Sequence, residues 1–410
     1  MVAQSPAADI NAGMDDGTAQ RQTAATAIDG PVPWYAIALL ICVLGPFSLN
    51  GGFIYPANAF KLDSLGYTAS VVGAVGSAGA IGYVIGSVLA PIVATAFGLR
   101  HTAIGAILLT ALCILGFGVI PPVLAWYPLR LTHGIATTAL FVCGESVLIG
   151  MAPAAMRGRI LGFYTALNSV FFASGPAIVS MLGFKDVLPY ILVAGCISLL
   201  ALPMAALGQR TPQLPTVPWR QLANSVGSIP LLLTVIAAWG WIDGAMLNLW
   251  GVYAVRRGLT ASHASDLMAL LAFGNVFLQF PIGWLADHMP RRRVLTGLAG
   301  IGMLLSLLLP LLDIAGLPLA AVLVAIAAAG FGTFTVSLIA LGDVLTGAAL
   351  VAANGAFGVL WGLGDFTGAL GTGALMDWVG PDAFPLALSL GFLVQCVATL
   401  ILPLKLRSAH

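Results

Sequence analysis

The chain has 410 residues, of which 60% are hydrophobic and 8% are charged, and its formal net charge is +1. A soluble domain usually carries about a quarter charged residues, so the composition indicates that a lipid bilayer surrounds most of the surface. The near-neutral balance gives no support for a nucleic-acid interface, which requires clustered basic side chains. The five cysteines stand singly in apolar segments, which favours buried small side chains over a metal site or disulfide bonds.

Residues 1–32 are polar and lack the basic segment and apolar run of a signal peptide, so we expect a disordered cytoplasmic tail. Twelve apolar segments of about 20 to 25 residues follow, each long enough to cross about 30 Å of hydrocarbon as a helix. The predicted spans are 34–58, 70–94, 101–121, 126–151, 160–183, 188–208, 229–254, 264–286, 294–315, 318–341, 352–375 and 384–404.

The longest internal connection, residues 209–228, contains three prolines and separates six spans from six. Extended, proline-rich segments of this kind connect domains rather than cross a membrane. We therefore expect an N-terminal half at 33–208, a cytoplasmic linker at 209–228, a C-terminal half at 229–404 and a cytoplasmic tail at 405–410.

Lysine and arginine are unevenly distributed between the two sides of the predicted spans. Eleven lie on the side of the N-terminus, one lies inside a span, and the opposite side holds Lys61, Lys185, Arg256 and Arg257. Because short cytoplasmic loops are enriched in basic residues, we expect both termini in the cytoplasm and the chain in the inner membrane of a bacterial-type cell.

Residues 283–293 read Gly-Trp-Leu-Ala-Asp-His-Met-Pro-Arg-Arg-Arg and form the end of the eighth span and the turn after it. This segment resembles the signature loop of the major facilitator superfamily (MFS), G-x-L-a-D-r-x-G-r-R/K, with a proline in place of the second glycine. The resemblance implies a loop that latches the halves in the outward-facing state, with gating residues Gly283, Asp287, Arg291 and Arg292. We expect Gly283 to allow close helix approach, and Asp287 to cap a helix N-terminus and accept from an arginine.

A similar turn ends the second span at residues 91–100, which indicates an internal repeat of the two halves. Thr95 stands where the signature loop has its acid, and Ala96 stands where it has the following base, while Gly98 and Arg100 remain. The N-terminal copy therefore lacks the acid of the latch.

The fourth and fifth spans carry a second pattern: an R-x-x-x-G motif, an E-S pair and an R-G-R motif, at Arg130–Gly134, Glu145–Ser146 and Arg157–Arg159. This order resembles a group of bacterial MFS permeases typified by YcaD. The subgroup resemblance covers about 130–183, and the superfamily pattern covers about 34–404. The subgroup resemblance does not identify a substrate.

Glu145 is the only glutamate of the chain, and burial in a span costs free energy unless the carboxylate is paired or protonated. One interpretation is a proton or cation site. The other is a salt bridge to Arg100, Arg157 or Arg159 that forms part of a gate. We favour the gate, because Glu145 lies only about two helical turns from the cytoplasmic end of its span.

Arg130 lies one turn inside the fourth span, about 22 Å along the helix from Glu145, too far for the two to pair. An arginine there must face the protein interior or extend to the membrane interface. Recognition of a carboxylate or phosphate, help with proton release, and simple snorkelling all fit. His133 shares its helix face and either titrates or is held by hydrogen bonds.

Asp243 and Asp365 fall near the middle of spans seven and eleven. In the MFS arrangement, spans 1, 4, 7 and 10 line the central cavity and spans 2, 5, 8 and 11 flank it, so both acids can face the path. No basic residue lies mid-membrane in the second half to neutralise them. We favour a proton-coupling role for Asp243, and leave Asp365 open between coupling and a protonated interhelical hydrogen bond.

Further polar and aromatic side chains within the spans are candidates for the cavity wall. Each also has a structural alternative, an interhelical hydrogen bond for the amides and lipid-facing packing for the tryptophans. The candidates are Asn50, Asn168, Asn248, Asn275, Gln279, Trp241 and Trp361.

The sequence thus predicts an all-α membrane protein with twelve transmembrane helices in two six-helix halves. We find no Walker loop, zinc spacing or nucleophile–base set, so we expect neither an enzyme nor a cofactor. The predicted function is secondary active transport of a small organic solute by alternating access, coupled to protons. Proton-linked efflux of amphiphiles is the alternative, and a non-transporting membrane sensor is the alternative of another class. We expect a monomer that binds a small solute, protons and lipid, and no nucleic acid.

Overall fold

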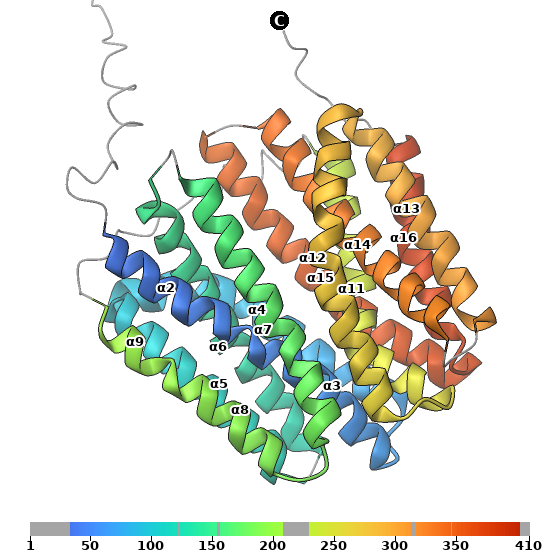
Figure 1. The fold of residues 1–410 in the computed structure, drawn as a ribbon, viewed down its shortest axis with the longest axis horizontal. Helices are drawn as coiled ribbons and strands as arrows, with labels where there is room; N and C mark the ends of the chain where they lie inside the picture. Colours follow the sequence, from blue (N-terminus) through green and yellow to red (C-terminus); the bar gives the residue numbers. More distant parts are fainter. Residues whose placement is uncertain are drawn as a thin grey trace, which may run out of the picture.

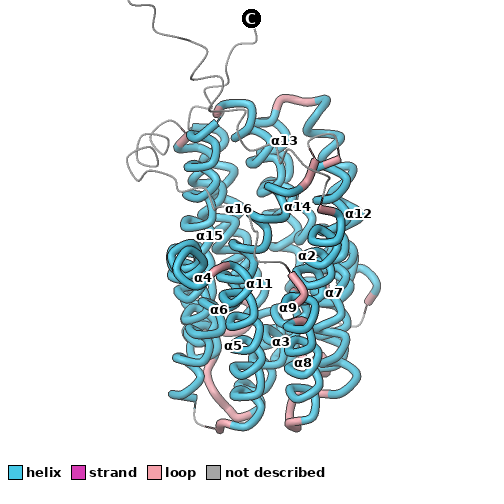
Figure 2. The backbone as a smooth tube through the Cα atoms, turned by 90° about the vertical axis from the view of Figure 1, so that its left-hand side faces the viewer, coloured by secondary structure: helices cyan, strands magenta, loops and turns pink. Residues whose placement is uncertain are grey.

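The computed structural model describes residues 33–121, 123–153, 156–207, 229–312, 316–345 and 347–401. The predicted tails, 1–32 and 405–410, and the predicted linker 209–228 lie outside these ranges. Within them the chain forms helices and contains no strand (Figures 1 and 2).

The helices follow the predicted spans in order. The first six spans are α2 (Trp34–Phe47) with α3 (Leu49–Ser64), α4 (Ala69–Phe97), α5 (Leu99–Val119), α6 (Val123–Met151), α7 (Arg157–Leu182), and α8 (Leu188–Leu199) with α9 (Ala201–Ala205). The last six are α11 (Pro230–Arg256), α12 (Ala261–His288), α13 (Arg291–Leu308) with the 3-10 turn η1 (Leu309–Leu311), α14 (Leu317–Val344), α15 (Gly347–Val379) and α16 (Ala383–Ile401).

Among the described residues, 11 helices are long and apolar enough to cross a membrane. The twelfth span is α15, which has 33 residues but is richer in glycine and carries Asp365 and Asp377. The predicted ends differ most for α3, which continues past residue 58 to Ser64, and for α15, which begins at Gly347 rather than 352. The continuation of α3 contains Lys61, Asp63 and Ser64 and is more polar than the span it extends, so hydropathy alone does not reveal it.

The second span of each half begins in the same way. Gly66 and Gly258 adopt positive φ angles of 81° and 101°, and a threonine follows two residues later in each case. Thr68 accepts from the third backbone N–H of α4 and Thr260 accepts from the equivalent N–H of α12, at 3.4 and 3.2 Å. Only glycine adopts such φ angles readily, so the shared Gly-x-Thr turn supports the internal repeat.

Helix α15 packs between α4 of the first half and α11 of its own half, and the N-terminal and C-terminal spans lie on opposite sides of Figure 1. The contacts are close enough to require glycine. A Cβ at Gly73 would collide with the backbone oxygen of Ala369, and one at Gly240 would collide with the backbone oxygen of Trp361. Small residues let membrane helices approach closely in this way.

Twelve spans separate Trp34 from Ile401, so both lie at one end of the bundle, which we call the terminal end. The opposite end is called the far end. At the far end Asp377 of α15 accepts from the backbone N–H groups of Ala69 and Ser70, at 2.9 and 2.7 Å, at the N-terminus of α4. A carboxylate is favourable at a helix N-terminus, so this contact joins the two halves.

Two further polar contacts close the far end. Arg256 of α11 lies 3.3 Å from Asp63 of α3 and 3.7 Å from Asp377. The hydroxyls of Ser180 on α7 and Ser262 on α12 share a hydrogen bond of 2.8 Å. In the described part of the chain, every hydrogen bond and ion pair between the halves lies on this side of the central cavity. The structure is therefore closed at the far end.

Candidate functional site

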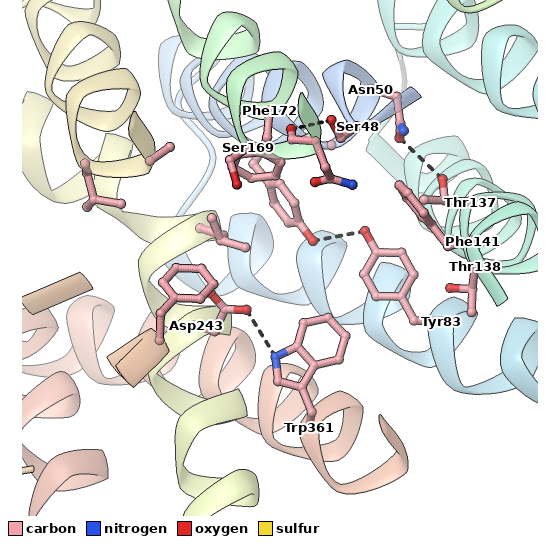
Figure 3. A pocket seen from close by; sticks show the side chains of 17 residues that line it. Ser48, Asn50, Tyr83, Thr137, Thr138, Phe141, Ser169, Phe172, Asp243 and Trp361 are labelled. Atoms are coloured by element: carbon pink, nitrogen blue, oxygen red, sulfur yellow. Dashed lines mark hydrogen bonds between the residues drawn. The ribbon is translucent and has the colours of Figure 1, made fainter. Parts of the chain in front are cut away.

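A cavity of about 370 Å³ lies between the halves, near the middle of the spans (Figure 3). Its wall is mostly apolar and aromatic, with a few polar groups, as is usual for small-molecule sites. The first half contributes Ser48, Asn50, Gly51, Tyr55, Tyr83, Thr137, Thr138, Phe141, Asn168, Ser169 and Phe172, and the second half contributes Asp243, Leu247, Leu271, Ala272, Phe331 and Trp361.

Asp243 is the one carboxylate that lines the cavity among the described residues. The indole N–H of Trp361 on α15 donates to Asp243 Oδ2 on α11 at 3.1 Å (Figure 3). The Trp361 ring also stacks on Tyr83 of the other half, with the ring centroids 6.0 Å apart. In the described part of the chain no basic side chain forms an ion pair with Asp243. The acid is therefore held by a single neutral donor at the junction of the halves.

Tyr55 and Tyr83 share a hydrogen bond of 3.0 Å across the cavity wall, and Arg130 lies behind this pair. The Arg130 guanidinium carbon is 4.5 Å from the centroid of the Tyr55 ring, within the range of a cation–π contact. Arg130 is only 2% exposed and donates to His133 Nδ1 at 3.1 Å. It is buried rather than snorkelling, and neither Arg130 nor His133 lines the cavity.

Asn50 and Asn168, both predicted from the sequence, line the wall of the first half. The Asn50 amide donates to the backbone oxygen of Phe47 and accepts from Thr137 at 3.4 Å. The backbone oxygen of Asn168 accepts from the Ser48 hydroxyl at 2.6 Å. The first two bonds hold the Asn50 amide in place, and the third holds the backbone of α7 at Asn168, in an otherwise apolar wall.

Glu145 pairs with neither Arg100 nor Arg159, two of its three predicted salt-bridge partners, within the described structure. Its Oε1 accepts from the Tyr164 hydroxyl at 2.6 Å. The Arg157 side chain lies outside the described part of the structure. The Glu145 side chain points toward α7, where the Tyr164 hydroxyl supplies its hydrogen-bond partner.

Asp365 and Asn248 lie behind the cavity wall rather than on it. Asp365 is 1% exposed and packs against Gly244, and its Oδ1 has no hydrogen-bond partner among the described residues. Asn248 donates to the backbone oxygen of Gly244 at 2.8 Å and borders a small void together with Asn58 and Arg130. Buried polar groups thus form a layer between the cavity and the far end.

Two other predicted wall residues are interhelical contacts instead. Gln279 of α12 accepts from the Thr335 hydroxyl of α14 at 2.9 Å, and the Trp241 indole of α11 donates to the backbone oxygen of Ala387 on α16 at 3.0 Å. Neither lines the cavity, because each side chain points toward a neighbouring helix of its own half. The Asn275 side chain lies outside the described part of the structure.

The hydrogen bonds and ion pairs of the signature turn after α12 all lie within its own half among the described residues. Arg291 lies 3.1 Å from Asp343 of α14 and 3.7 Å from Asp287, and Arg292 donates to the backbone oxygens of Thr399 and Leu400 at the C-terminus of α16. A cation is favourable at a helix C-terminus. The turn is therefore not engaged as a latch between the halves in this state.

Two expectations for this turn are wrong in the described state. A Cβ at Gly283 would meet nothing within 4 Å, so close helix approach does not require this glycine. Pro290 precedes α13 and no side chain caps that helix, so Asp287 does not act as its cap. Asp287 instead pairs with Arg291, as expected, at 3.7 Å.

Sequence reasoning missed the aromatic part of the wall. Tyr55, Tyr83, Phe141, Phe172 and Phe331 all line the cavity. The two tyrosines carried a usable signal, because a phenol hydroxyl deep inside an apolar span needs a partner. The phenylalanines carried none, since the same residue also faces lipid.

No group of three His, Cys, Asp or Glu side chains is placed to hold a metal ion among the described residues. The site therefore offers amide, hydroxyl, aromatic and single-carboxylate contacts. Such a set suits noncovalent contacts with a small molecule, and among the described lining residues it contains no nucleophile–base pair.

The family model described as Major Facilitator Superfamily matches residues 40–369 and 246–408. The chain is 25% identical over 355 residues to the uncharacterized MFS-type transporter YfkF of Bacillus subtilis, covering 84% of this chain and 88% of that protein. It is also 25% identical over 311 residues to the uncharacterized MFS-type transporter YcaD of Escherichia fergusonii, covering 75% of this chain and 80% of that protein.

Solved structures share the fold at low sequence identity. A mutant of the nucleoside transporter NupG superposes with a TM-score of 0.73 at 14% identity, covering 89% of this chain and 99% of that chain. A bacterial homolog of the human lysosomal transporter Spinster, in an inward-facing and occupied conformation, gives a TM-score of 0.72 at 14% identity, covering 91% and 95%. The predicted fold and the predicted resemblance are confirmed: the chain is a multi-pass membrane transport protein and belongs to the major facilitator superfamily.

Proposed function

We propose that the protein is a secondary active transporter that moves a small organic solute across the inner membrane, coupled to protons, by alternating access. The observation that carries this proposal is Asp243, a carboxylate in the wall of a cavity shared by both halves. Its hydrogen-bond partner, Trp361, also contacts the opposite half through Tyr83, so the acid lies where the halves meet.

Proton coupling follows from the cost of a carboxylate in a membrane interior. An ionised acid there needs a cation, several donors or water, and otherwise takes up a proton. Asp243 has one neutral donor and no ion-pair partner in the described structure. A proton or a cationic group of the solute can therefore neutralise it, and competition between the two couples solute movement to proton movement.

The loop charges favour cytoplasmic termini, and in that orientation the far end is the outer face. In that orientation the described state is closed to the outside by Asp377, Arg256 and the Ser180–Ser262 contact. Transport requires a second state in which these contacts break and the terminal end closes. The signature turn around Asp287 is available to close the terminal end, since its hydrogen bonds and ion pairs among the described residues all lie within its own half.

The cavity wall favours a solute with an aromatic or apolar body that is neutral or cationic. The Trp361 and Tyr83 rings offer stacking surfaces, and Asp243 and the two amides offer polar contacts. Arg130, which would favour an anion, lies behind Tyr55 and does not line the cavity. The same aromatic wall supports the second candidate function, proton-linked efflux of amphiphiles, for which a larger set of unrelated cationic compounds would be transported.

The test begins with a thermal-stability screen of the purified protein, which selects a solute for transport in liposomes. We expect the wild type to accumulate that solute when a pH gradient is imposed. Asp243→Asn keeps the size of the side chain but cannot carry the proton, so it should exchange solute without accumulating it. Asp266→Asn, an exposed acid at the far end of α12, is the matched control and should behave as the wild type.

Gradient-driven accumulation by Asp243→Asn at the wild-type level would contradict the proton-coupling role. A wild type that binds the solute but neither exchanges nor accumulates it would instead indicate a membrane sensor, the alternative of another class.

A further inference from the structure

A chain of hydrogen bonds leads from the cavity wall to Glu145. The Asn168 amide nitrogen donates to the Tyr164 hydroxyl oxygen at 3.4 Å, and the Tyr164 hydroxyl donates to Glu145 Oε1 at 2.6 Å. Asn168 lines the cavity, whereas Tyr164 and Glu145 do not. The only glutamate of the chain is thus connected to the solute cavity through two side chains.

The direction of these bonds depends on the charge of the carboxyl group. An ionised carboxylate only accepts, so Tyr164 must donate its single proton to Glu145. The phenol oxygen can then accept from Asn168 but has no proton to give it. The Asn168 amide therefore turns its NH₂ group toward Tyr164 and leaves its oxygen, an acceptor, for the cavity. The described structure shows this arrangement.

Protonation of Glu145 permits the opposite arrangement. A carboxylic acid donates one hydrogen bond, so Glu145 can donate to the phenol oxygen and Tyr164 can donate to the Asn168 oxygen. The amide must then rotate by half a turn about its last bond. This rotation presents the NH₂ group, a donor, to the cavity. No atom moves further than the rotation of a hydroxyl and an amide requires.

We propose that Glu145 is a positioning residue that sets, through Tyr164, whether Asn168 presents an acceptor or a donor to the solute. The ionised form selects solutes with N–H, O–H or ammonium groups at this wall, and the protonated form selects solutes with carbonyl or ether oxygens. The proposal rests on the proposed function for its biological meaning, because it gives the cavity a second protonation-dependent group, on the opposite wall from Asp243.

Among the described residues Tyr164 is the hydrogen-bond partner of Glu145. Helices α2, α4 and α5 pack on α6, and the charged groups nearest this end on these helices and on α7 are Arg100 and His101 of α5 and Arg157 and Arg159 of α7. Arg100, His101 and Arg159 form no ion pair with Glu145, and the Arg157 side chain lies outside the described part of the chain. Its protonation is therefore transmitted to the cavity through the phenol.

Infrared difference spectroscopy tests the proposal without any solute or transport assay. Cell-free synthesis with carbon-13 glutamate labels one residue, because Glu145 is the only glutamate. Spectra of the full chain in lipid vesicles are recorded across about pH 4 to 9, the range in which buried carboxyl groups titrate. We expect a label-sensitive carboxyl band and, with the same midpoint, a side-chain amide band that is absent in Asn168→Ala.

Two variants separate the relay from a structural role. Tyr164→Phe removes the connecting hydroxyl, so the carboxyl band should remain while the Asn168 amide band no longer changes with pH. Glu145→Gln removes the titrating group, so both changes should disappear. Asn50→Ala is the matched control, because Asn50 lines the same cavity without contacting Tyr164, and it should keep both bands.

Persistence of the Asn168 band change in Tyr164→Phe or in Glu145→Gln would overturn the proposal. It would also be overturned if Glu145 does not titrate in this range, or titrates without any Asn168 band. None of these results depends on transport, so failure of the proton-coupled transport function would be seen separately, in liposomes.

Discussion

At the scale of single residues, the polar side chains within the spans divide into two groups. Asp243, Asn50, Asn168 and Trp361 line the cavity, whereas Trp241 joins two helices of one half. The sequence could identify all of them as unusual within apolar spans, but it could not assign them to a group. A membrane helix is apolar on every side, so hydropathy does not mark which face looks inward.

Gly244 is required for helix packing although it belongs to no sequence signature, whereas Gly283 belongs to the signature turn but is not required for packing. A Cβ at Gly244 would collide with the backbone oxygen of Asp365, whereas a Cβ at Gly283 meets nothing within 4 Å. Forcing a methyl group into a packed interface costs about 1 to 3 kcal/mol. We expect Gly244→Ala to lower the thermal unfolding midpoint of the purified protein and Gly283→Ala to leave it within error. Equal melting curves for the two variants would contradict the packing of α11 on α15.

Removing the two indole hydrogen bonds should have different effects, a loss of solute affinity for Trp361 and a loss of stability for Trp241. Trp361→Phe removes the donor to Asp243 and should weaken solute binding by roughly tenfold or more, since a hydrogen bond to a charged group contributes about 1.5 to 3 kcal/mol. Trp241→Phe removes a bond to the backbone of α16 and should lower stability without changing affinity. Isothermal titration calorimetry and thermal unfolding of both variants measure these effects. An affinity loss in Trp241→Phe alone would place the site elsewhere.

At the scale of elements, apolar length located all twelve spans, and the repeated Gly-x-Thr turn before α4 and α12 would have strengthened the internal repeat. The contact of Asp377 with the N-terminus of α4 could not be predicted, because its partners are about 300 residues apart in the chain and no local pattern relates them. The same holds for Arg256, whose two acids lie on α3 and α15.

Closure of the far end should depend on Asp377. In a background without the five native cysteines, Ser180→Cys with Ser262→Cys should form a disulfide, because the two hydroxyls are 2.8 Å apart. Asp377→Ala leaves the N-terminus of α4 and Arg256 without this carboxylate, so the rate of cross-linking should fall severalfold. Asp382→Ala, which breaks an ion pair with Arg257 within the second half, is the control. An unchanged rate in Asp377→Ala would show that other contacts hold this end closed.

At the scale of the whole molecule, composition and hydropathy predicted a bundle of two six-helix halves, and the signature turn after α12 predicted the superfamily. The state of the bundle could not be predicted. Whether the turn latches or rests depends on a balance between two global arrangements, and one sequence encodes both. The described structure shows the arrangement in which the turn forms its ion pairs and hydrogen bonds with α14 and α16, and the far end is closed.

A reversible lock at the far end tests whether one cavity opens alternately to the two sides of the membrane. The Ser180→Cys, Ser262→Cys protein is reconstituted in liposomes, and exchange of the selected solute is measured before oxidation, after oxidation and after reduction. We expect the cross-link to leave solute binding intact and to stop exchange, and we expect reduction to restore exchange to its initial rate. Exchange at an undiminished rate in the fully cross-linked protein would contradict alternating access through this cavity.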